Sequence, residues 1–247
     1  MCGRFTLTEP DVGVLLETFS LTHPPEPLPP RYNIAPTQAV ATVVNENDGS
    51  RVLRLMRWGL IPGWAKDPTI GARMINARSE TVAEKPAYRN ALKRRRCLIV
   101  ADGFYEWQKQ PGGGKVPMFI TLADRQPFGF AGLYEIWTEP ESGASLVTCT
   151  IITGPANDRV KPIHDRMPVI LPPDAYDRWL DPREMNTGLL TALLQPYPAE
   201  QMAAYPVSAR VNSPSNDDPG LIERASQGGI PAGTIEPAAI RRCYAVG

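Results

Sequence analysis

The chain has little of what marks metal-binding, disulfide-stapled or membrane-spanning proteins. Its 247 residues include only four cysteines and two histidines, and no C-x-x-C pair occurs. Such usage disfavours a zinc site and a disulfide framework, so we expect no metal and no other cofactor. No apolar run approaches the roughly 18 residues of a membrane helix, and the start lacks a basic-then-apolar signal pattern. We therefore expect a soluble, intracellular protein without a membrane partner.

The chain also lacks net charge, because 26 Lys and Arg balance 26 Asp and Glu. The balance hides an asymmetry along the sequence. Residues 1–100 carry 14 basic and 9 acidic side chains, whereas the remainder carries 12 and 17. The N-terminal part can therefore accommodate an anionic partner.

Short runs of alternating or apolar residues dominate the rest of the pattern. They predict strands at 38–45, 51–61, 97–108, 116–123, 128–137, 145–153 and 167–171. Helices are expected at 8–19 with Thr8 as N-cap, and at 85–95, 173–180 and 186–194. No regular βαβ alternation occurs, which favours an α+β fold with a curved, mostly antiparallel, barrel-like sheet and short flanking helices. We expect one domain over residues 1–224, followed by a loose Gly/Pro/Ala-rich tail at 225–247.

Cys2 is the most reactive side chain in an unusual position. Methionine aminopeptidases remove Met1 when the second residue is small, which leaves a cysteine with a free α-amine. Near neutral pH an appreciable fraction of such an amine is uncharged, and the thiol is easily activated. The amine of a 1,2-aminothiol attacks an aldehyde to give an imine, and the thiol then closes onto the imine carbon to form a five-membered thiazolidine. The alternative is a small residue that simply begins the first strand. Cys97 and Cys149 lie in apolar runs and are expected to be buried.

Three other stretches hold candidate polar groups. In MINARSE, Asn76 and Arg78 are two residues apart, which places them on one face of an extended segment. An amide and a guanidinium suit a polar oxygen and a phosphate. Glu106 lies in the aromatic run ADGFYEW, where it is either a salt-bridging residue or a buried general acid with a raised pKa. His164 in IHDRMP is either structural or a proton carrier.

Basic and aromatic residues alternate in the Pro/Gly-rich tracts RYNIAPTQ and RWGLIPGWAKD. Such loops can stack bases and hold phosphates, although Trp58 at a strand end is better explained as core. Trp64 lies between a glycine and a charged turn and is the stronger candidate for a ligand surface. The basic run 93–96 is expected to be a solvated helix end.

These stretches together resemble one known family. The blocks MCGRF, RYNIAPTQ, RWGLIPGWAKD, INARSET, ADGFYEW, FAGLYEIW, TGPAN, IHDRMPVIL and YPVSARVNSPSNDDPGLIE, in this order, are similar to the SOS response-associated peptidase (SRAP) family of abasic-site processing proteins. The similarity spans residues 2–222. It implies a single SRAP-like domain that captures abasic sites in single-stranded DNA as a thiazolidine on the mature N-terminal cysteine. The glycine in TGPAN departs from the pattern, which places a hydrogen-bonding side chain there.

The resemblance also implies a role for individual residues. Cys2 is the nucleophile, Asn76 holds the site in register, Glu106 shuttles protons, and His164 assists by proton transfer on the sugar hydroxyl and in reversal. The residues implied in DNA binding are Arg4, Asn33, Pro36, Trp64, Asn76 and Arg78. Among these, Arg4 and Arg78 resemble phosphate ligands, and Pro36 with Trp64 resembles a wedge that excludes duplex DNA.

Two other functions are compatible with the same residues. One is an N-terminal-nucleophile thiol peptidase or amidohydrolase, in which Cys2 attacks a carbonyl. The other is a non-covalent single-strand binding module. The family resemblance favours a monomer in the cytoplasm, associated with the nucleoid in a bacterium or located in the nucleus of a eukaryote.

Overall fold

Five strands close into a barrel in the computed structural model, which describes residues 2–225. Around the barrel the order is β4 (Arg51–Trp58), β3 (Ala39–Asn45), β6 (Arg96–Ala101), β9 (Phe128–Thr138) and β10 (Ser145–Pro155). These neighbours pair antiparallel, and β10 then returns to β4 through a parallel pairing that closes the ring. The predicted α+β fold with a barrel-like core is thus confirmed. Its closure depends on a parallel contact that sequence periodicity does not reveal.

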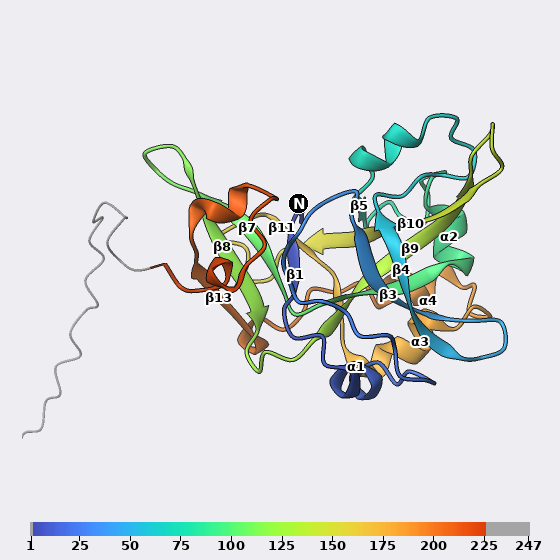
Figure 1. Ribbon diagram of the computed structural model, residues 1–247, viewed down its shortest axis with the longest axis horizontal. Coiled ribbons are helices and arrows are strands. Elements are labelled where there is room, and N and C mark those ends of the chain that lie inside the picture. Colours follow the sequence, from blue (N-terminus) through green and yellow to red (C-terminus); the bar gives the residue numbers. More distant parts are fainter. Residues whose placement is uncertain (1, 226–247) are drawn as a thin grey trace, which may run out of the picture.

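A second, five-stranded antiparallel sheet lies beside the barrel (Figure 1). Its order is β13 (Met202–Pro206), β8 (Lys115–Leu122), β7 (Gly103–Lys109), β1 (Phe5–Leu7) and β2 (Arg31–Ile34). Aromatic rings join the two bodies, because Phe5 packs edge-on against Trp58 and Phe130 at centroid distances of 5.1 and 5.8 Å. Such pairs prefer this edge-to-face geometry. The start of the chain is therefore anchored at the junction.

Short strands and helices complete the barrel. Three strands extend its rim: β5 (Asn76–Arg78) and β11 (Arg166–Pro168) pair with β10, and β12 (Ile170–Leu171) pairs with β9. The α-helices are α1 (Val12–Thr18), α2 (Arg89–Arg94), α3 (Tyr176–Leu180) and α4 (Thr187–Ala192). The 3-10 turns are η1 (Pro68–Arg73), η2 (Pro173–Ala175), η3 (Ala199–Gln201), η4 (Ala209–Asn212) and η5 (Pro219–Leu221). Within residues 2–225, no helix is long and apolar enough to cross a membrane.

The strand expected at 97–108 is in fact two strands that belong to different sheets. The chain leaves the barrel at Asp102, whose carboxylate accepts hydrogen bonds from the hydroxyls of Thr6 at 2.5 Å and Thr8 at 2.7 Å. Thr8 therefore does not cap the first helix as expected. Asp11 is the N-cap instead, and its side chain accepts from the backbone N–H of Val14 at 2.9 Å.

The basic run at the end of α2 is only partly solvated, which corrects the sequence-based expectation. Lys93 and Arg94 are exposed, but Arg96 is buried and donates to the backbone carbonyls of Trp179 at 2.6 Å and Leu92 at 2.7 Å. Burial lowers the pKa of its guanidinium. Arg96 thus links the carboxyl-end carbonyls of α2 and α3.

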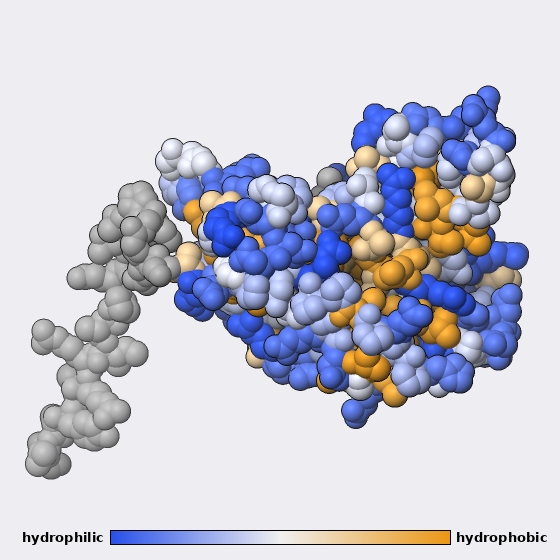
Figure 2. Space-filling model, viewed as in Figure 1, coloured by the Kyte–Doolittle hydropathy of each residue, from blue (hydrophilic) through white to orange (hydrophobic). Residues whose placement is uncertain are grey.

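The other core predictions are confirmed for the described residues. Trp58, Cys97 and Cys149 are completely buried, and the Trp58 indole donates to the carbonyl of Ile75 at 2.9 Å. Figure 2 shows hydrophilic side chains over most of the second sheet, while apolar ones gather over the barrel, where Leu55 is 59% exposed. The tail expected at 225–247 lies, except for its first residue, outside the described residues.

Candidate functional site

Cys2 lies just before β1, at the junction of the two sheets, and is completely buried. Its backbone carbonyl accepts a hydrogen bond of 2.8 Å from the side-chain amide of Asn76. Asn76 begins β5, whose parallel pairing with β10 places it opposite Ile151. The Cys2 sulfur lies 3.8 Å from the carbonyl oxygen of Arg4. The rim of the barrel therefore fixes the backbone of the predicted nucleophile.

Glu106 reaches the same place from β7. The antiparallel register pairs Phe5 with Phe104, so that the chain before β1 runs alongside Glu106. Burial raises the pKa of the Glu106 carboxyl, and positive charge on His164 partly opposes that rise. Burial, followed by the charge of Glu106, raises the pKa of the Cys2 thiol well above its usual range. Both groups therefore favour their protonated forms more than free side chains do.

His164 lies in the loop between β10 and β11, and its side chain is 29% exposed. Its Nδ1 accepts a hydrogen bond of 3.0 Å from the backbone N–H of Arg166. The carboxylate of Asp165 lies 2.8 Å from the same nitrogen. The side chain of Gln108 on β7 donates to the carbonyl of Pro162 at 3.2 Å, which ties this loop to the strand of Glu106. Cys2, Asn76, Glu106 and His164 are thus brought together from four separate segments.

Arg4 and Asn33 have mainly internal partners. One guanidinium nitrogen of Arg4 donates to Asn33 Oδ1 at 3.0 Å and to the carbonyl of Val211 at 2.8 Å. Asn33 is completely buried, and its Nδ2 donates to the carbonyls of Val211, Ser213 and Asn216. These bonds hold the segment 211–216 against β1 and β2. The structure therefore places Asn33 where it positions its neighbours, while Arg4 is only partly buried.

The remaining residues implied in DNA binding are more accessible. Arg78 is exposed at the end of β5, two residues beyond Asn76. Trp64 has 64% of its surface exposed. Pro36 is half-buried in the turn after β2, which is tied to the end of β4 because the N–H of Thr37 donates to the carbonyl of Trp58 at 2.8 Å. Their roles in binding stay predictions.

One contact near His164 was not anticipated from the sequence. The guanidinium of Arg166 forms a two-point ion pair with Glu80, with distances of 2.8 and 2.9 Å. Both residues belong to blocks that carry the family resemblance, INARSET and IHDRMPVIL. Their opposite charges were the available signal, but their separation of 86 residues gave no reason to pair them.

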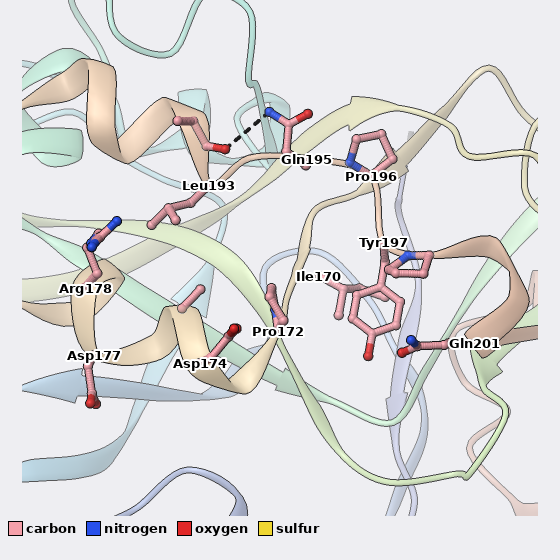
Figure 3. Close-up of a pocket in the computed structure, with 13 residues that line it drawn as sticks. Ile170, Pro172, Asp174, Asp177, Arg178, Leu193, Gln195, Pro196, Tyr197 and Gln201 are labelled. Atoms are coloured by element: carbon pink, nitrogen blue, oxygen red, sulfur yellow. Dashed lines mark hydrogen bonds between the residues drawn. The ribbon is translucent and has the colours of Figure 1, made fainter.

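The pocket drawn in Figure 3 lies elsewhere, between α3 and the chain that follows α4. It has a volume of about 720 Å³, and Ile170, Leu193 and Tyr197 line it together with Asp174. None of the predicted site residues lines it. Within residues 2–225, no three His, Cys, Asp or Glu side chains gather as metal ligands would.

Known proteins similar to this chain share both its sequence and its fold. Abasic site processing protein YoqW of Bacillus subtilis (strain 168) is 49% identical over 225 residues, which cover 90% of this chain and 99% of that protein. Abasic site processing protein YedK of Escherichia coli (strain K12) is 34% identical, with coverage of 90% and 99%. A crystal structure of a Bacteroides thetaiotaomicron protein superposes with a TM-score of 0.81 at 25% identity, covering 91% of this chain and all of the other.

The family comparison agrees with these relatives. The model of the SOS response associated peptidase (SRAP) family matches residues 1–214, which include every residue of the site around Cys2. This match covers most of the chain, and four residues of the blocks that carry the resemblance, Cys2, Asn76, Glu106 and His164, lie together in the structure. The chain belongs to the SOS response associated peptidase (SRAP) family.

Proposed function

We propose that the protein recognises abasic sites in single-stranded DNA and captures them covalently as a thiazolidine on Cys2. The names of its relatives support abasic-site processing. The observation that carries the covalent step is the gathering of Cys2, Asn76, Glu106 and His164 at one place, with the Cys2 carbonyl held at 2.8 Å from the Asn76 amide. This arrangement supplies a nucleophile, a fixed backbone and two proton carriers.

The reaction begins with hydrolysis of the Met1–Cys2 peptide bond, which frees the α-amine of Cys2. An abasic deoxyribose is mostly a closed hemiacetal. It opens to the aldehyde when its ring oxygen gains a proton, the bond from that oxygen to C1 breaks, and the C1 hydroxyl loses its proton. Glu106 suits this donation because burial raises its pKa and keeps it protonated to higher pH than an ordinary glutamate. Capture then draws on an aldehyde that is formed inside the site.

The amine of Cys2 attacks the aldehyde carbon first, and water leaves as the imine forms. The thiol, whose pKa is raised by burial, adds next. A carbon–sulfur bond forms, the C=N double bond becomes single, and the thiol proton moves to the nitrogen. An open imine promotes strand cleavage by β-elimination, so ring closure protects the strand. A lysine has no neighbouring thiol and could not complete this second step.

Recognition in this proposal depends on the backbone and on stacking, because an abasic site presents no base. Arg78 is exposed beside Asn76 and is suited to the flanking phosphate. Trp64, with 64% of its surface exposed, can stack on a neighbouring base or block a second strand. Binding is then weakly sequence-dependent and decreases as salt increases.

Intact mass analysis tests the covalent step. The full chain is incubated with a single-stranded oligonucleotide in which uracil-DNA glycosylase has created one abasic site. The expected product has the mass of the protein without Met1, plus the oligonucleotide, minus one water. Cys2→Ala should give no adduct. Cys243→Ser should react like the unmodified sequence, which would show that the adduct does not form on the Cys243 thiol.

The same experiment separates the competing functions. Turnover of peptides without any DNA adduct would favour an N-terminal-nucleophile peptidase. Binding to the oligonucleotide that is equal for the unmodified chain and Cys2→Ala, again without an adduct, would favour a non-covalent binding module. An adduct mapped to any side chain other than Cys2, or formed while Met1 is still attached, would refute the thiazolidine.

A further inference from the structure

The ion pair between Glu80 and Arg166 links the two segments that bring Asn76 and His164 to the site. Glu80 follows β5, the strand of Asn76, and Arg166 begins β11, just after the His164 loop. The two nitrogens of Arg166 lie 2.8 and 2.9 Å from the two carboxylate oxygens. A third contact of 2.6 Å joins Arg166 to the carbonyl of Thr153 on β10. The Arg166 side chain is only 14% exposed, so solvent competes weakly for it.

The backbone of Arg166 in turn determines which ring nitrogen of His164 carries the proton. Its N–H donates to Nδ1 at 3.0 Å, so Nδ1 of the neutral ring is an acceptor and has no hydrogen. A neutral imidazole then has its single proton on Nε2. In the imidazolium both nitrogens are protonated, and Nδ1 can donate to Asp165 at 2.8 Å. Nε2 therefore carries a proton in both charge states.

From this geometry we infer that Glu80 is a positioning residue: by holding Arg166 at two points, it fixes the amide that keeps the proton of His164 on Nε2. The inference deepens the proposed function and rests on it for its chemical meaning. The neutral His164 ring then presents Nε2–H as a hydrogen-bond donor. The sugar oxygens are suitable acceptors for such a donor.

Two neighbours of His164 Nδ1 act in opposite directions: the Arg166 N–H donates to it, whereas the Asp165 carboxylate at 2.8 Å favours a proton on it. Glu106 on β7 is the acidic group that interacts with the ring from the neighbouring sheet. Asp165 faces Nδ1 but is 86% exposed on its side chain, so water screens its attraction for the imidazolium. Arg166 directs its positive charge toward Glu80 and Thr153. Glu106 and His164 thus interact between the second sheet and the loop before β11.

Histidine ring spectroscopy provides a direct test, since the chain has only two histidines. In a His23→Asn background, long-range ¹⁵N–¹H spectra of the full chain report the tautomer of the neutral His164 ring. We expect a single Nε2–H tautomer, and a mixture of both tautomers in Glu80→Ala and in Arg166→Lys. Glu46→Gln is the matched control, because Glu46 pairs with Arg54 on the exposed β3–β4 hairpin. It should leave the spectrum unchanged.

The kinetic readout uses the same variants. Adduct formation in Glu80→Ala should slow by about tenfold or less, because a hydrogen-bond donor is misplaced but not removed. Its pH profile should also change shape, and Glu80→Asp should restore part of the rate. A His164 tautomer that stays Nε2–H in folded Glu80→Ala and Arg166→Lys would overturn the inference, as would an Nδ1–H tautomer in the unmodified ring. If the spectra behave as expected but no adduct ever forms, the positioning stands and the proposed function fails.

Discussion

The barrel and the second sheet differ in the acidic and amide groups that they bury, although the barrel also buries threonines and Arg96. Every residue of β6, a barrel strand, is buried, and its interior run Cys97–Ala101 is entirely apolar. The second sheet instead buries an amide and two carboxylates, those of Asn33, Asp102 and Glu106. Asn33 and Asp102 are each satisfied by several hydrogen bonds from distant parts of the chain.

The difference indicates how stability and chemistry are divided between them. Burial of apolar surface is favourable and does not depend on direction. A buried polar group, by contrast, costs free energy unless its hydrogen-bond partners lie at the right distance and angle. The apolar side chains of the barrel therefore contribute chiefly to stability. The second sheet holds polar groups in fixed positions near the start of the chain. Substitutions in the two regions should consequently separate loss of stability from loss of chemistry.

Leu98→Ala, in the barrel, should have the largest effect on stability. Leu98 is completely buried on β6, and removing its methyl groups leaves a cavity beside Gly129. The expected loss in the free energy of unfolding is about 3 kcal/mol, measured by urea denaturation. The rate of adduct formation per folded molecule should not change. A large drop in that rate at full folding would show that the barrel interior also shapes the site.

Asn33→Ala, in the second sheet, should cost less stability but affect the site. Three backbone carbonyls and the Arg4 guanidinium lose their partner, which we expect to cost about 2 kcal/mol. The segment 211–216 should loosen and capture should slow, as followed by urea denaturation and adduct kinetics. Asn90→Ala, at an exposed position of α2, is the control and should be neutral. If the two substitutions changed stability and adduct kinetics equally, the hydrogen bonds of Asn33 would not be what holds segment 211–216 in place.

The same contrast explains what could be predicted from the sequence. The strands β3, β4, β7 and β8 follow from local alternation and overlap segments that were predicted as strands. The parallel pairing of β10 with β4 and the departure of the chain at Asp102 could not be predicted, because they depend on contacts between residues far apart. Arg96 shows the same limit, since its buried partners Trp179 and Asp181 are more than 80 residues away.

The candidate site was accessible mainly through the family resemblance. Cys2 could be singled out by position, and Glu106 by a carboxylate within an aromatic run. Nothing local indicated that Asn33 would be buried or that Glu80 would hold Arg166. Such roles depend on three-dimensional hydrogen-bond partners. Sequence patterns therefore identified reactive groups better than the residues that position them.

Glu106→Gln should have a smaller effect on stability, and of the opposite sign. The folded-state pKa of Glu106 is raised, so the folded protein loses stability as pH rises above the ordinary glutamate pKa of about 4.3. A neutral isostere removes this cost, and we expect a gain of about 1 kcal/mol at pH 7 that disappears near pH 4. The rate of adduct formation should fall about a hundredfold, and the part of its pH dependence that comes from protonation of Glu106 should disappear. A variant less stable than the unmodified chain at pH 7 would show that the charged form is favoured by its partners.

Trp64→Ala should change stability least of all, because 64% of the Trp64 surface is already in water. We expect the free energy of unfolding to stay within about 0.5 kcal/mol of its original value. Fluorescence anisotropy with single-stranded and duplex oligonucleotides measures the affinity of the variant for each kind of DNA. If the exposed indole stacks on a base or blocks a second strand, the variant should bind single strands less tightly and discriminate less against duplex. Unchanged discrimination would assign the exclusion of duplex to the depth at which Cys2 is buried, and would leave Trp64 without a role in selecting single strands.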